Sequence, residues 1–259
     1  MRVLFLFLFL IVSCGSGESL DSTQSKQDLP TTSFTQNEPR SLRLASYNFH
    51  GIPKIAKKNE FARHNKTRAR AFLQQLRRKA QVNELPDILV LQEVFDPGLI
   101  QVFASESPYQ YGFTDNNGSF NINIDLLNIS NSKLTGSGLL VLSKFPITRQ
   151  GLFYFPDDMC ADDDCFSKKG VGFTDIYIPG LDISFEIYNT HMQSGQNNNS
   201  VRRDQLEFIY EVFKRTSKRK MGVIVGDFNF RELIPEEREL IDDTESWFES
   251  TNLTRSCLN

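Results

Sequence analysis

The sequence predicts one α/β domain in which two β-sheets pack against each other. Short apolar runs alternate with amphipathic helical patterns between residues 41 and 259, which is typical of mixed α/β folds. The 259-residue chain is 39% hydrophobic and contains 22 Phe, which is enough apolar surface for a sizeable core. Its net charge of −3 is unlike that of proteins dedicated to coating nucleic acid, which are strongly basic.

The first half of the domain is expected to contain two strands around one helix. Residues 42–47 alternate between apolar and polar side chains and predict a strand that ends at Asn48. Residues 66–81 place apolar side chains at helical spacing, with basic residues on the other face. Residues 87–91 follow Pro86 and are apolar after the first position, which favours a strand buried on both faces.

The second half is expected to contain four strands and two helices. Pro179 and Gly180 separate two strand-like segments and predict a hairpin. Pro146 marks the exit from an earlier buried strand. The expected strands are 138–143, 171–178, 183–189 and 223–225, and the expected helices are 201–214 and 235–248, the last of them acidic.

Residues 1–13 have the form of an export signal. Arg2 precedes an unbroken apolar stretch that is too short to span a bilayer. Cys14 follows it after Ser13 and resembles the lipidated Cys of a bacterial lipobox, although an ordinary signal with an incidental Cys14 is the alternative. Residues 14–40 are polar and predict a flexible tether to a domain at 41–259. We therefore expect an exported protein, either a cell-envelope lipoprotein or a secreted one.

Polar side chains collect where the predicted strands end. Asn48 and Glu93 follow two strands of the first half, whereas His191, Asp227 and Asn229 follow two strands of the second half. Strand ends are where α/β sheets build sites. Oxygen ligands of this kind suit Mg²⁺ beside a phosphate, and a His supplies a donor or proton carrier. Each residue alone is more often an ordinary turn or packing residue, so the inference depends on the set.

Six short motifs follow one another along the domain. They are Y-N at 47–48, L-Q-E-V-F at 91–95, G-L-L-V-L-S-K-F-P-I at 138–147, K-G-V at 169–171, Y-N-T-H-M-Q at 188–193 and G-D-F-N at 226–229. This ordered set resembles the endonuclease/exonuclease/phosphatase superfamily, and in combination the motifs are most similar to its secreted bacterial sphingomyelinase C-like branch. The resemblance covers residues 42–253 and implies a four-layer αββα sandwich of two mixed sheets.

The resemblance implies a role for each residue at the strand ends. Glu93 matches the main Mg²⁺ ligand, and Asn48 matches the amide beside that metal. His191 matches the residue that binds the phosphate and stabilises its developing charge. Asp227 matches the residue that orients the attacking water, and Asn229 the one that fixes that Asp and the phosphate. Such an arrangement neutralises the charge of a phosphoryl transition state.

The segment before the K-G-V motif carries several further candidates. Lys169 matches a family Lys that helps to hold the phosphate or its loop, and the alternative is a surface Lys in a tight turn. Cys160 and Cys165 of an exported chain are expected to form a local disulfide, with two free thiols as the alternative. The Asp residues around them form either a second cation site or, more simply, a solvated loop. The basic residues of 54–79 suit either contact with anionic lipid headgroups or nucleic acid or, equally, a solvated helix face.

The chain also departs from the family pattern. Family members end in an S-D-H motif whose His is the general base, whereas the three His here are His50, His64 and His191. We therefore expect the last part of the fold to be missing beyond Asn259, and loss of an essential base lowers a rate by orders of magnitude. Three interpretations stay open: a truncated gene product, a relative that binds without turnover, or residual base function of a group such as Asp227.

The predicted function is that of an exported, Mg²⁺-dependent phosphodiesterase-type domain. The implied reaction is hydrolysis of a phospholipid headgroup, such as the cleavage of sphingomyelin to ceramide and phosphocholine. The expected partners are Mg²⁺ or another divalent cation and a membrane phospholipid, whereas nucleic acid is less favoured. A nuclease of the same superfamily and a catalytically inactive surface binding or adhesion protein are the alternatives.

Overall fold

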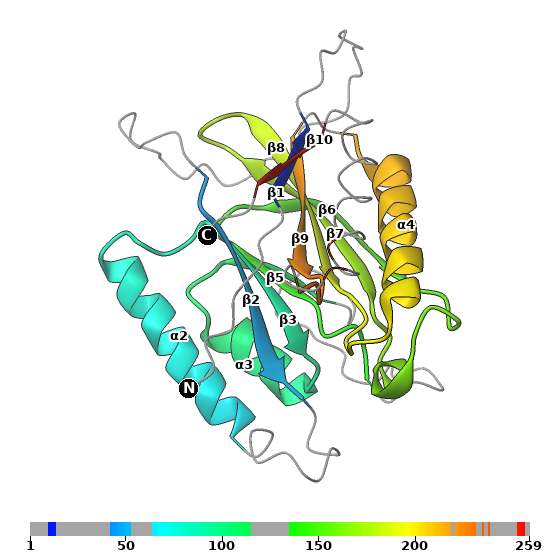
Figure 1. Ribbon diagram of the computed structural model, residues 1–259. Helices are drawn as coiled ribbons and strands as arrows, with labels where there is room; N and C mark the ends of the chain where they lie inside the picture. Colours follow the sequence, from blue (N-terminus) through cyan, green and yellow to red (C-terminus); the bar gives the residue numbers. More distant parts are fainter. Residues whose placement is uncertain are drawn as a thin grey trace, which may run out of the picture.

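Two four-stranded sheets pack face to face in the computed structural model, and helices cover their outer faces (Figure 1). The structure describes residues 10–13, 42–52, 64–114, 135–218, 221–231, 235, 238 and 253–256, and every structural statement refers to these. Each sheet contains both parallel and antiparallel pairs. The predicted α/β sandwich of two mixed sheets is therefore confirmed.

The first sheet has the strand order β2-β3-β5-β4. β2 is parallel to β3, whereas β5 is antiparallel to both β3 and β4. Its strands are β2 (Leu44–Gly51), β3 (Ile88–Val94), β4 (Tyr111–Thr114) and β5 (Leu140–Ser143).

Two helices, α2 (Asn65–Gln81) and α3 (Pro97–Glu106), cover the outer face of the first sheet (Figure 1). The buried residues of α2 include Ala69, Leu73 and Leu76, which recur at helical spacing and join one apolar cluster with α3 and β3. This spacing is the pattern that predicted the helix, and the observed bounds differ from the expected ones by one residue.

The second sheet has the strand order β6-β7-β8-β9. β7 and β8 form the predicted antiparallel hairpin, and β8 pairs with β9 in parallel. A short 3-10 helix, η1 (Asp162–Phe166), lies in the connection between β6 and β7. The strands are β6 (Ile147–Tyr154), β7 (Gly170–Ile178), β8 (Ile183–His191) and β9 (Gly222–Asp227).

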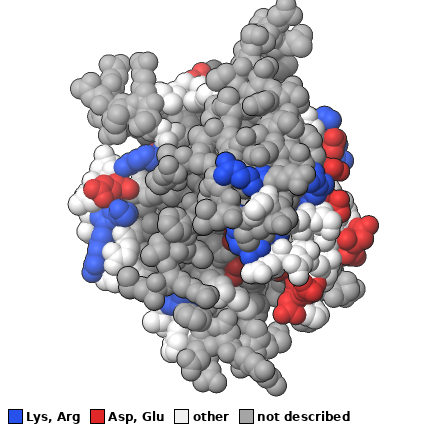
Figure 2. Space-filling model, in the orientation of Figure 1, with Lys and Arg blue, Asp and Glu red and all other residues white. Residues whose placement is uncertain are grey.

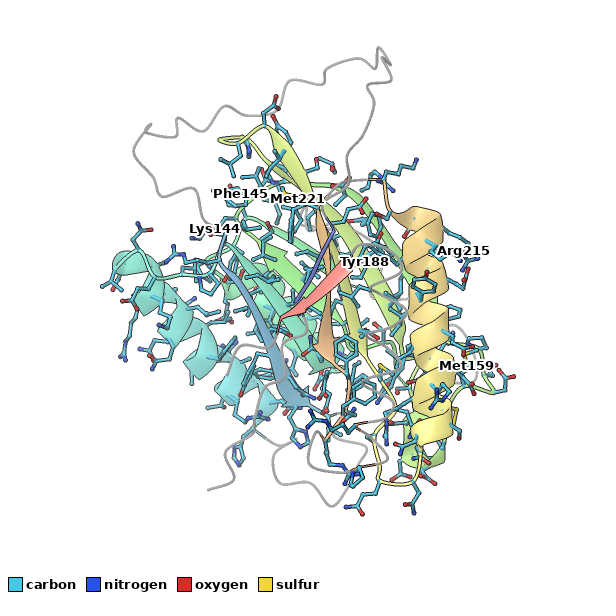
Figure 3. The ribbon with its side chains drawn as sticks, turned by 45° about the horizontal axis from the view of Figure 1, so that its top comes forward. Lys144, Phe145, Met159, Tyr188, Arg215 and Met221 are labelled. Atoms are coloured by element: carbon cyan, nitrogen blue, oxygen red, sulfur yellow. A yellow bond between two sulfur atoms is a disulfide. The ribbon has the colours of Figure 1, made fainter. Side chains whose placement is uncertain are left out.

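Helix α4 (Asn199–Thr216) covers the outer face of the second sheet (Figure 1). Leu206 and Ile209 of α4 belong to the apolar cluster beneath the helix. Tyr188 of β8 points out of the sheet toward α4 (Figure 3), and its ring centroid lies 5.2 Å from that of Phe213. The helix is thus joined to the strand that ends at His191.

The core between the sheets explains the apolar run of β3. Ile88 and Val90 belong to the cluster between the two sheets, whereas Leu89 and Leu91 belong to the cluster under α2 and α3. Successive strand residues point to opposite faces, so a strand covered on both sides is apolar at every position. The prediction of a strand buried on both faces is confirmed.

Among the α-helices and the strands of the two four-stranded sheets, α3, β4 and β6 lie where the sequence patterns predicted none. β6 is an edge strand, and most of its residues are partly exposed, so it lacks the apolar run that marks a buried strand. β4 has four residues, which is too short for a period to be visible. β3 also extends to Val94, so Glu93 belongs to the strand itself.

Several expected features lie outside the described residues. They include Cys14, the tether at 14–40 and nearly all of the helix expected at 235–248. β1 (Leu10–Ser13) pairs antiparallel with β10 (Leu253–Ser256), and β1 falls within the expected signal segment. Cleavage of that segment and lipidation of Cys14 stay predictions. Among the helices of the described ranges, none combines the length and apolar character needed to cross a membrane.

Candidate active site

The two parallel strand pairs bring the predicted residues to one edge of the sandwich. The arrowheads of β2, β3 and β9 point to this edge in Figure 1. In the first sheet Asn48 is aligned with Gln92, one residue before Glu93, and in the second His191 is aligned with Asp227. Because the strands of a parallel pair end at the same edge, each sheet supplies half of the site.

A buried pair of amides joins the two sheets directly beneath this edge. Gln92 Nε2 donates a hydrogen bond of 2.9 Å to Asn189 Oδ1, and Asn189 Nδ2 donates one of 3.0 Å to the Leu91 carbonyl. Both amide side chains belong to residues that are at most 1% exposed. Buried amides are retained when their hydrogen bonds are made, so this pair fixes how β3 and β8 lie relative to each other.

Asn48 connects the carboxylates of the two sheets. Its Nδ2 donates to Glu93 Oε1 at 2.7 Å and to Asp227 Oδ2 at 2.8 Å. Its Oδ1 accepts a hydrogen bond of 2.9 Å from the His50 backbone N–H. The amide nitrogen of Asn48, and not its oxygen, therefore faces the two carboxylates.

Glu93 is held as a carboxylate. Burial disfavours its ionised form, but the hydrogen bonds from His50 and Asn48 and the charge of His191 outweigh burial and lower the pKa of Glu93 to about 2. His50 Nδ1 lies 3.0 Å from Glu93 Oε2, and this contact raises the pKa of His50. Both oxygens of Glu93 thus have neighbouring protein groups.

His191 is buried beside both carboxylates. Its Nε2 lies 3.9 Å from Glu93 Oε1, 4.0 Å from Asp227 Oδ2 and 3.4 Å from Lys169 Nζ. Burial lowers the pKa of His191, and the neighbouring ammonium of Lys169 lowers it further. Its buried Nδ1 has no hydrogen-bond partner within the described part of the chain. A buried polar atom in this state is common at functional sites, where a ligand or water completes the bonding.

Lys169 and Asn229 meet at a single backbone carbonyl. Lys169 Nζ and Asn229 Nδ2 each donate a hydrogen bond of 2.9 Å to the Met192 carbonyl. The Asn229 backbone N–H also donates to Asp227 Oδ1 at 3.0 Å, which fixes that carboxylate. Lys169 is only 6% exposed, so the alternative of a solvated surface Lys is wrong.

The donor set at this edge fits a divalent cation. Glu93, His191 and Asp227 each offer a ligand atom, and these atoms lie within 4.8 Å of one another. Two carboxylates that share one amide donor repel each other, and a hard cation with oxygen ligands relieves this repulsion. Asn48, Lys169 and Asn229 lie in direct contact with this group or with its neighbours.

Two residues at the site were not singled out from the sequence. His50 contacts Glu93, and Asp164 forms an ion pair of 2.8 Å with Lys169. His50 follows Asn48 by two positions, but the register of β2 against β3 shifts between Asn48 and Gly51 and His50 has a φ of 56°, so regular strand alternation does not predict its contact with Glu93.

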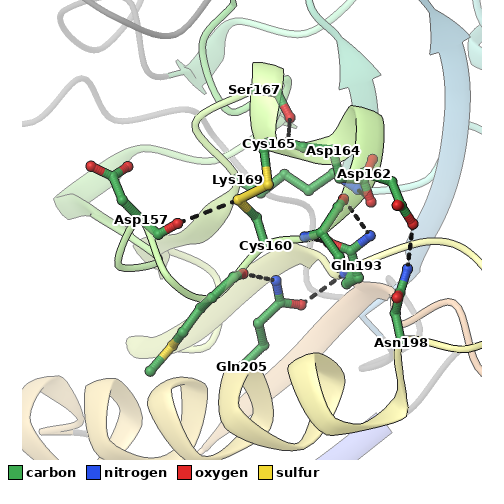
Figure 4. The surroundings of a disulfide bond; sticks show 12 residues. Asp157, Cys160, Asp162, Asp164, Cys165, Ser167, Lys169, Gln193, Asn198 and Gln205 are labelled. Carbon is green, nitrogen blue, oxygen red and sulfur yellow. Dashed lines mark hydrogen bonds and ion pairs between the residues drawn. A yellow bond between two sulfur atoms is a disulfide. The ribbon is translucent and has the colours of Figure 1, made fainter.

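The disulfide expected in the acidic segment is confirmed. Cys160 and Cys165 form a disulfide that encloses the start of η1, and Asp164 lies immediately before the second Cys (Figure 4). Asp163 is exposed to solvent, whereas the Asp164 side chain is only 17% exposed. Asp164 belongs to the acidic segment for which the sequence predicts a solvated loop or a second cation site, and no local pattern distinguishes it from its neighbours.

Charge is distributed unevenly over the surface. Figure 2 shows blue atoms at the left edge, over α2, and red atoms at the lower right, where Figure 1 places the segment that carries η1. Two cations of α2 have carboxylate partners: Arg70 pairs with Glu106, and Lys79 pairs with Glu84. Contact of this basic surface with anionic lipid or nucleic acid stays a prediction.

A family model supports the resemblance found in the motifs. The model described as "Endonuclease/Exonuclease/phosphatase family" matches residues 45–250. Sphingomyelinase C 2 of Leptospira interrogans serogroup Icterohaemorrhagiae serovar Lai (strain 56601) is 33% identical over 171 residues, which is 60% of this chain and 26% of that protein. The chain thus spans about a quarter of the length of this curated relative.

Solved structures share the fold at lower sequence identity. A variant of the Staphylococcus aureus beta toxin with bound magnesium ions has a TM-score of 0.60 and 21% identity, covering 79% of this chain and 70% of that one. Sphingomyelinase C of Streptomyces griseocarneus has a TM-score of 0.58 and 23% identity, covering 80% and 70%. These similarities show a common fold, which agrees with the two packed mixed sheets.

Proposed function

Because this chain belongs to the endonuclease/exonuclease/phosphatase family, we propose that it hydrolyses phosphoric diesters at the edge formed by β2, β3, β8 and β9. The observation that carries the proposal is the meeting of Asn48 and Glu93 from one sheet with His191 and Asp227 from the other. Two carboxylates and a buried imidazole that lie within a few ångströms of one another suit phosphoryl transfer, because the negative charge of the transition state must be neutralised.

A divalent cation, which we propose to be Mg²⁺, would be held by Glu93 with Asn48 beside it. When bound, such an ion supplies charge neutralisation at the phosphate. His191 and Lys169 are the donors that would contact phosphate oxygens. Asp227, the carboxylate at the end of β9, would orient the attacking water. We propose that the same carboxylate accepts the proton of that water. Asn229 would hold Asp227 in that orientation.

The substrate that we propose is a choline phospholipid, and among these lipids we propose sphingomyelin. This proposal is supported by the 33% identity with sphingomyelinase C 2 over 171 residues. The products would be ceramide and phosphocholine. We also propose export through residues 1–13 and lipid attachment at Cys14, which would keep the domain beside a membrane and its lipids.

Phosphocholine release from vesicles tests the substrate. Purified protein would be incubated with Mg²⁺ and vesicles that contain either sphingomyelin or phosphatidylcholine, with EDTA as the metal control. We expect release from sphingomyelin that stops when EDTA is added. Phosphatidylcholine carries the same headgroup, so it tests whether the ceramide part is recognised.

Two other results would contradict the proposal and identify its alternatives. Nicking of plasmid DNA without phosphocholine release would indicate a nuclease of the same family. Vesicle binding without any hydrolysis would indicate a binding protein. An active Glu93→Gln variant would separately show that the assignment of the metal site is wrong.

A further inference from the structure

The end of β2 departs from regular strand geometry beside the candidate site. Its register against β3 shifts between Asn48 and Gly51. His50 lies within this shift and has a φ of 56°, a conformation that costs free energy in residues other than Gly. Such a backbone keeps its conformation only where surrounding contacts hold it. The contacts made by residues 49–52 therefore decide how this segment presents its polar groups to the site.

Two side chains from the beginning of α2 bind the backbone of this segment. Arg68 donates hydrogen bonds of 2.7 Å from Nη2 to the Phe49 carbonyl and 3.1 Å from Nη1 to the His50 carbonyl. Asn65 Nδ2 donates to the Ile52 carbonyl at 2.8 Å. Residues three positions apart share one face of a helix, and α2 begins near the edge to which the arrowhead of β2 points (Figure 1).

The guanidinium group of Arg68 also packs against the core. It lies 5.0 Å from the ring centroid of Phe49, which is 2% exposed and belongs to the apolar cluster under α2 and α3. A guanidinium is planar, presents its donors in a rigid fork and stacks on aromatic rings, whereas a lysine ammonium is a compact point charge. The arrangement of two carbonyls and one ring therefore fits Arg and not Lys.

The segment that Arg68 binds orients two groups of the candidate site. The His50 N–H donates to Asn48 Oδ1 at 2.9 Å, which leaves Asn48 Nδ2 to donate to the carboxylates of Glu93 and Asp227. The imidazole of His50 contacts Glu93 through Nδ1, 3.0 Å from Oε2. His50 thus fixes Asn48 with its backbone and Glu93 with its side chain, and its own carbonyl is bound by Arg68.

We propose that Arg68 is a positioning residue, which holds the end of β2 in the conformation that lets His50 orient Asn48 and Glu93. The inference rests on the proposed function only for its effect on cation binding and on rate. Its structural part can be measured without substrate or metal. Arg68 belongs to the basic segment 54–79, so one cation of that segment acts inward on the site; a cation of a merely solvated helix face would affect neither group.

The first test measures amide exchange in Arg68→Lys. This change keeps the charge and loses the fork, and Arg70→Lys makes the same change on α2 at a residue that pairs with Glu106. NMR of isotope-labelled protein would follow exchange of the His50 amide, which the bond to Asn48 protects. We expect exchange at least about 10-fold faster in Arg68→Lys and unchanged in Arg70→Lys, because hydrogen bonds from a charged group contribute more than neutral ones.

The amide of Val90 separates a local effect from a general loss of stability. Val90 is fully buried in β3 and pairs with both β2 and β5. We expect its exchange to be unchanged in both variants, because the proposed effect is confined to the end of β2. Equal acceleration of the His50 and Val90 amides in Arg68→Lys would overturn the proposal. Unchanged protection of the His50 amide in that variant would overturn it as well.

The second test measures the proposed cation site by calorimetric titration with Mg²⁺. We expect Arg68→Lys to bind Mg²⁺ about 10-fold more weakly than the wild type, as for supporting residues of other metal sites, and Arg70→Lys to match the wild type. In sphingomyelin hydrolysis the Mg²⁺ concentration for half-maximal rate should rise by the same factor. Saturating Mg²⁺ should restore most of the rate, which would not follow from a loss of folded protein.

Unchanged Mg²⁺ affinity in Arg68→Lys would contradict the proposed role of Arg68. A wild-type protein that binds no Mg²⁺ or hydrolyses no diester would instead contradict the proposed function. The exchange of the His50 amide would still decide whether Arg68 holds the end of β2, so the two failures are distinguishable.

Discussion

At the scale of single residues, the site is built on backbone conformations that most side chains avoid. His50, Glu93 and Asn229 have positive φ angles of 56°, 57° and 55°. Such conformations cost free energy in residues other than Gly, and they persist where surrounding contacts hold them. His50 and Asn229 contact a carboxylate or a carbonyl of the site, and Glu93 supplies one of its carboxylates. The strain lies where the proposed chemistry needs fixed geometry.

Replacement of Glu93 with Gln tests the proposed cation ligand. Gln has the same size but no charge, so we expect Mg²⁺ binding to weaken and hydrolysis to fall about 100-fold or more. Calorimetric titration with Mg²⁺ and phosphocholine release would measure the two effects. Glu84→Gln, on the surface beside Lys79, is the matched control and should behave as the wild type.

Replacement of His50 with Ala tests the contact that orients Glu93. The change removes the imidazole 3.0 Å from Glu93 Oε2, and loss of a group that supports a ligand typically weakens metal binding about 10-fold. Titration with Mg²⁺ measures this affinity directly. His64→Ala changes an exposed His just before α2 and serves as the control; equal affinities in the two variants would contradict a role for His50.

At the scale of elements, the close fit of β8 to β9 carries His191 and Asp227 together. Gly226 of β9 has a φ of 154°, and a Cβ at this position would lie 2.0 Å from the Thr190 carbonyl oxygen. No side chain fits at that distance without moving one strand. The glycine therefore permits the parallel pairing that aligns the two site residues.

Replacement of Gly226 with Ala is expected to destabilise the protein and to misplace the site. Overpacking costs about 1–3 kcal/mol, and contact with backbone favours the upper end of that range. Urea unfolding would measure the loss. Gly151→Ala is the control, since a Cβ there meets only the Phe153 ring at 3.4 Å or more; equal losses for both variants would show that the contact with Thr190 is unimportant.

At the scale of the whole molecule, the candidate site is formed by residues from both sheets. Asn48 and Asp227 are 179 residues apart in sequence, yet their side chains are joined by a hydrogen bond of 2.8 Å. The apolar core between the sheets brings them together without specifying their relative position. The amides of Gln92 and Asn189 supply that specification, since hydrogen bonds are directional and apolar contacts are not.

The Asn189→Leu variant tests this role of the buried amides. It leaves the Leu91 carbonyl and one donor of Gln92 without their partner, at a cost of about 1–3 kcal/mol for each unsatisfied group. Denaturant unfolding gives the loss for the single variants and for the double variant with Gln92→Leu. We expect the double variant to lose less than the sum of the two, because the groups interact directly. Additivity would contradict a direct coupling.

The proposed anchor is also a property of the whole chain. Expression of the full chain in a bacterial host with labelled fatty acid should label the wild type and leave Cys14→Ser unlabelled. Acylation at two or more points gives durable membrane attachment, so only the wild type should enter the detergent phase on partition. Labelling of the Cys14→Ser variant would contradict the lipobox.

Local sequence patterns predicted much of the secondary structure and the residues of the candidate site. The apolar run of β3, the helical spacing in α2 and α4 and the hairpin of β7 and β8 were all predicted, because each depends on which faces of one segment are buried. Polar residues at strand ends likewise identified the candidate site. Edge strand β6 and helix α3 were not predicted, since a partly exposed edge strand lacks a clear hydrophobic pattern and α3 is only ten residues long.

Only the tertiary structure decided which of these residues meet. It joined Asn48 to Asp227 across the two sheets, and it distinguished Asp164, paired with buried Lys169, from the exposed Asp163 beside it. The physical reason is that a periodic pattern records that a face is covered but not which distant segment covers it. Ion pairs and hydrogen bonds between remote residues depend on the packing of whole sheets, which no local window of sequence contains.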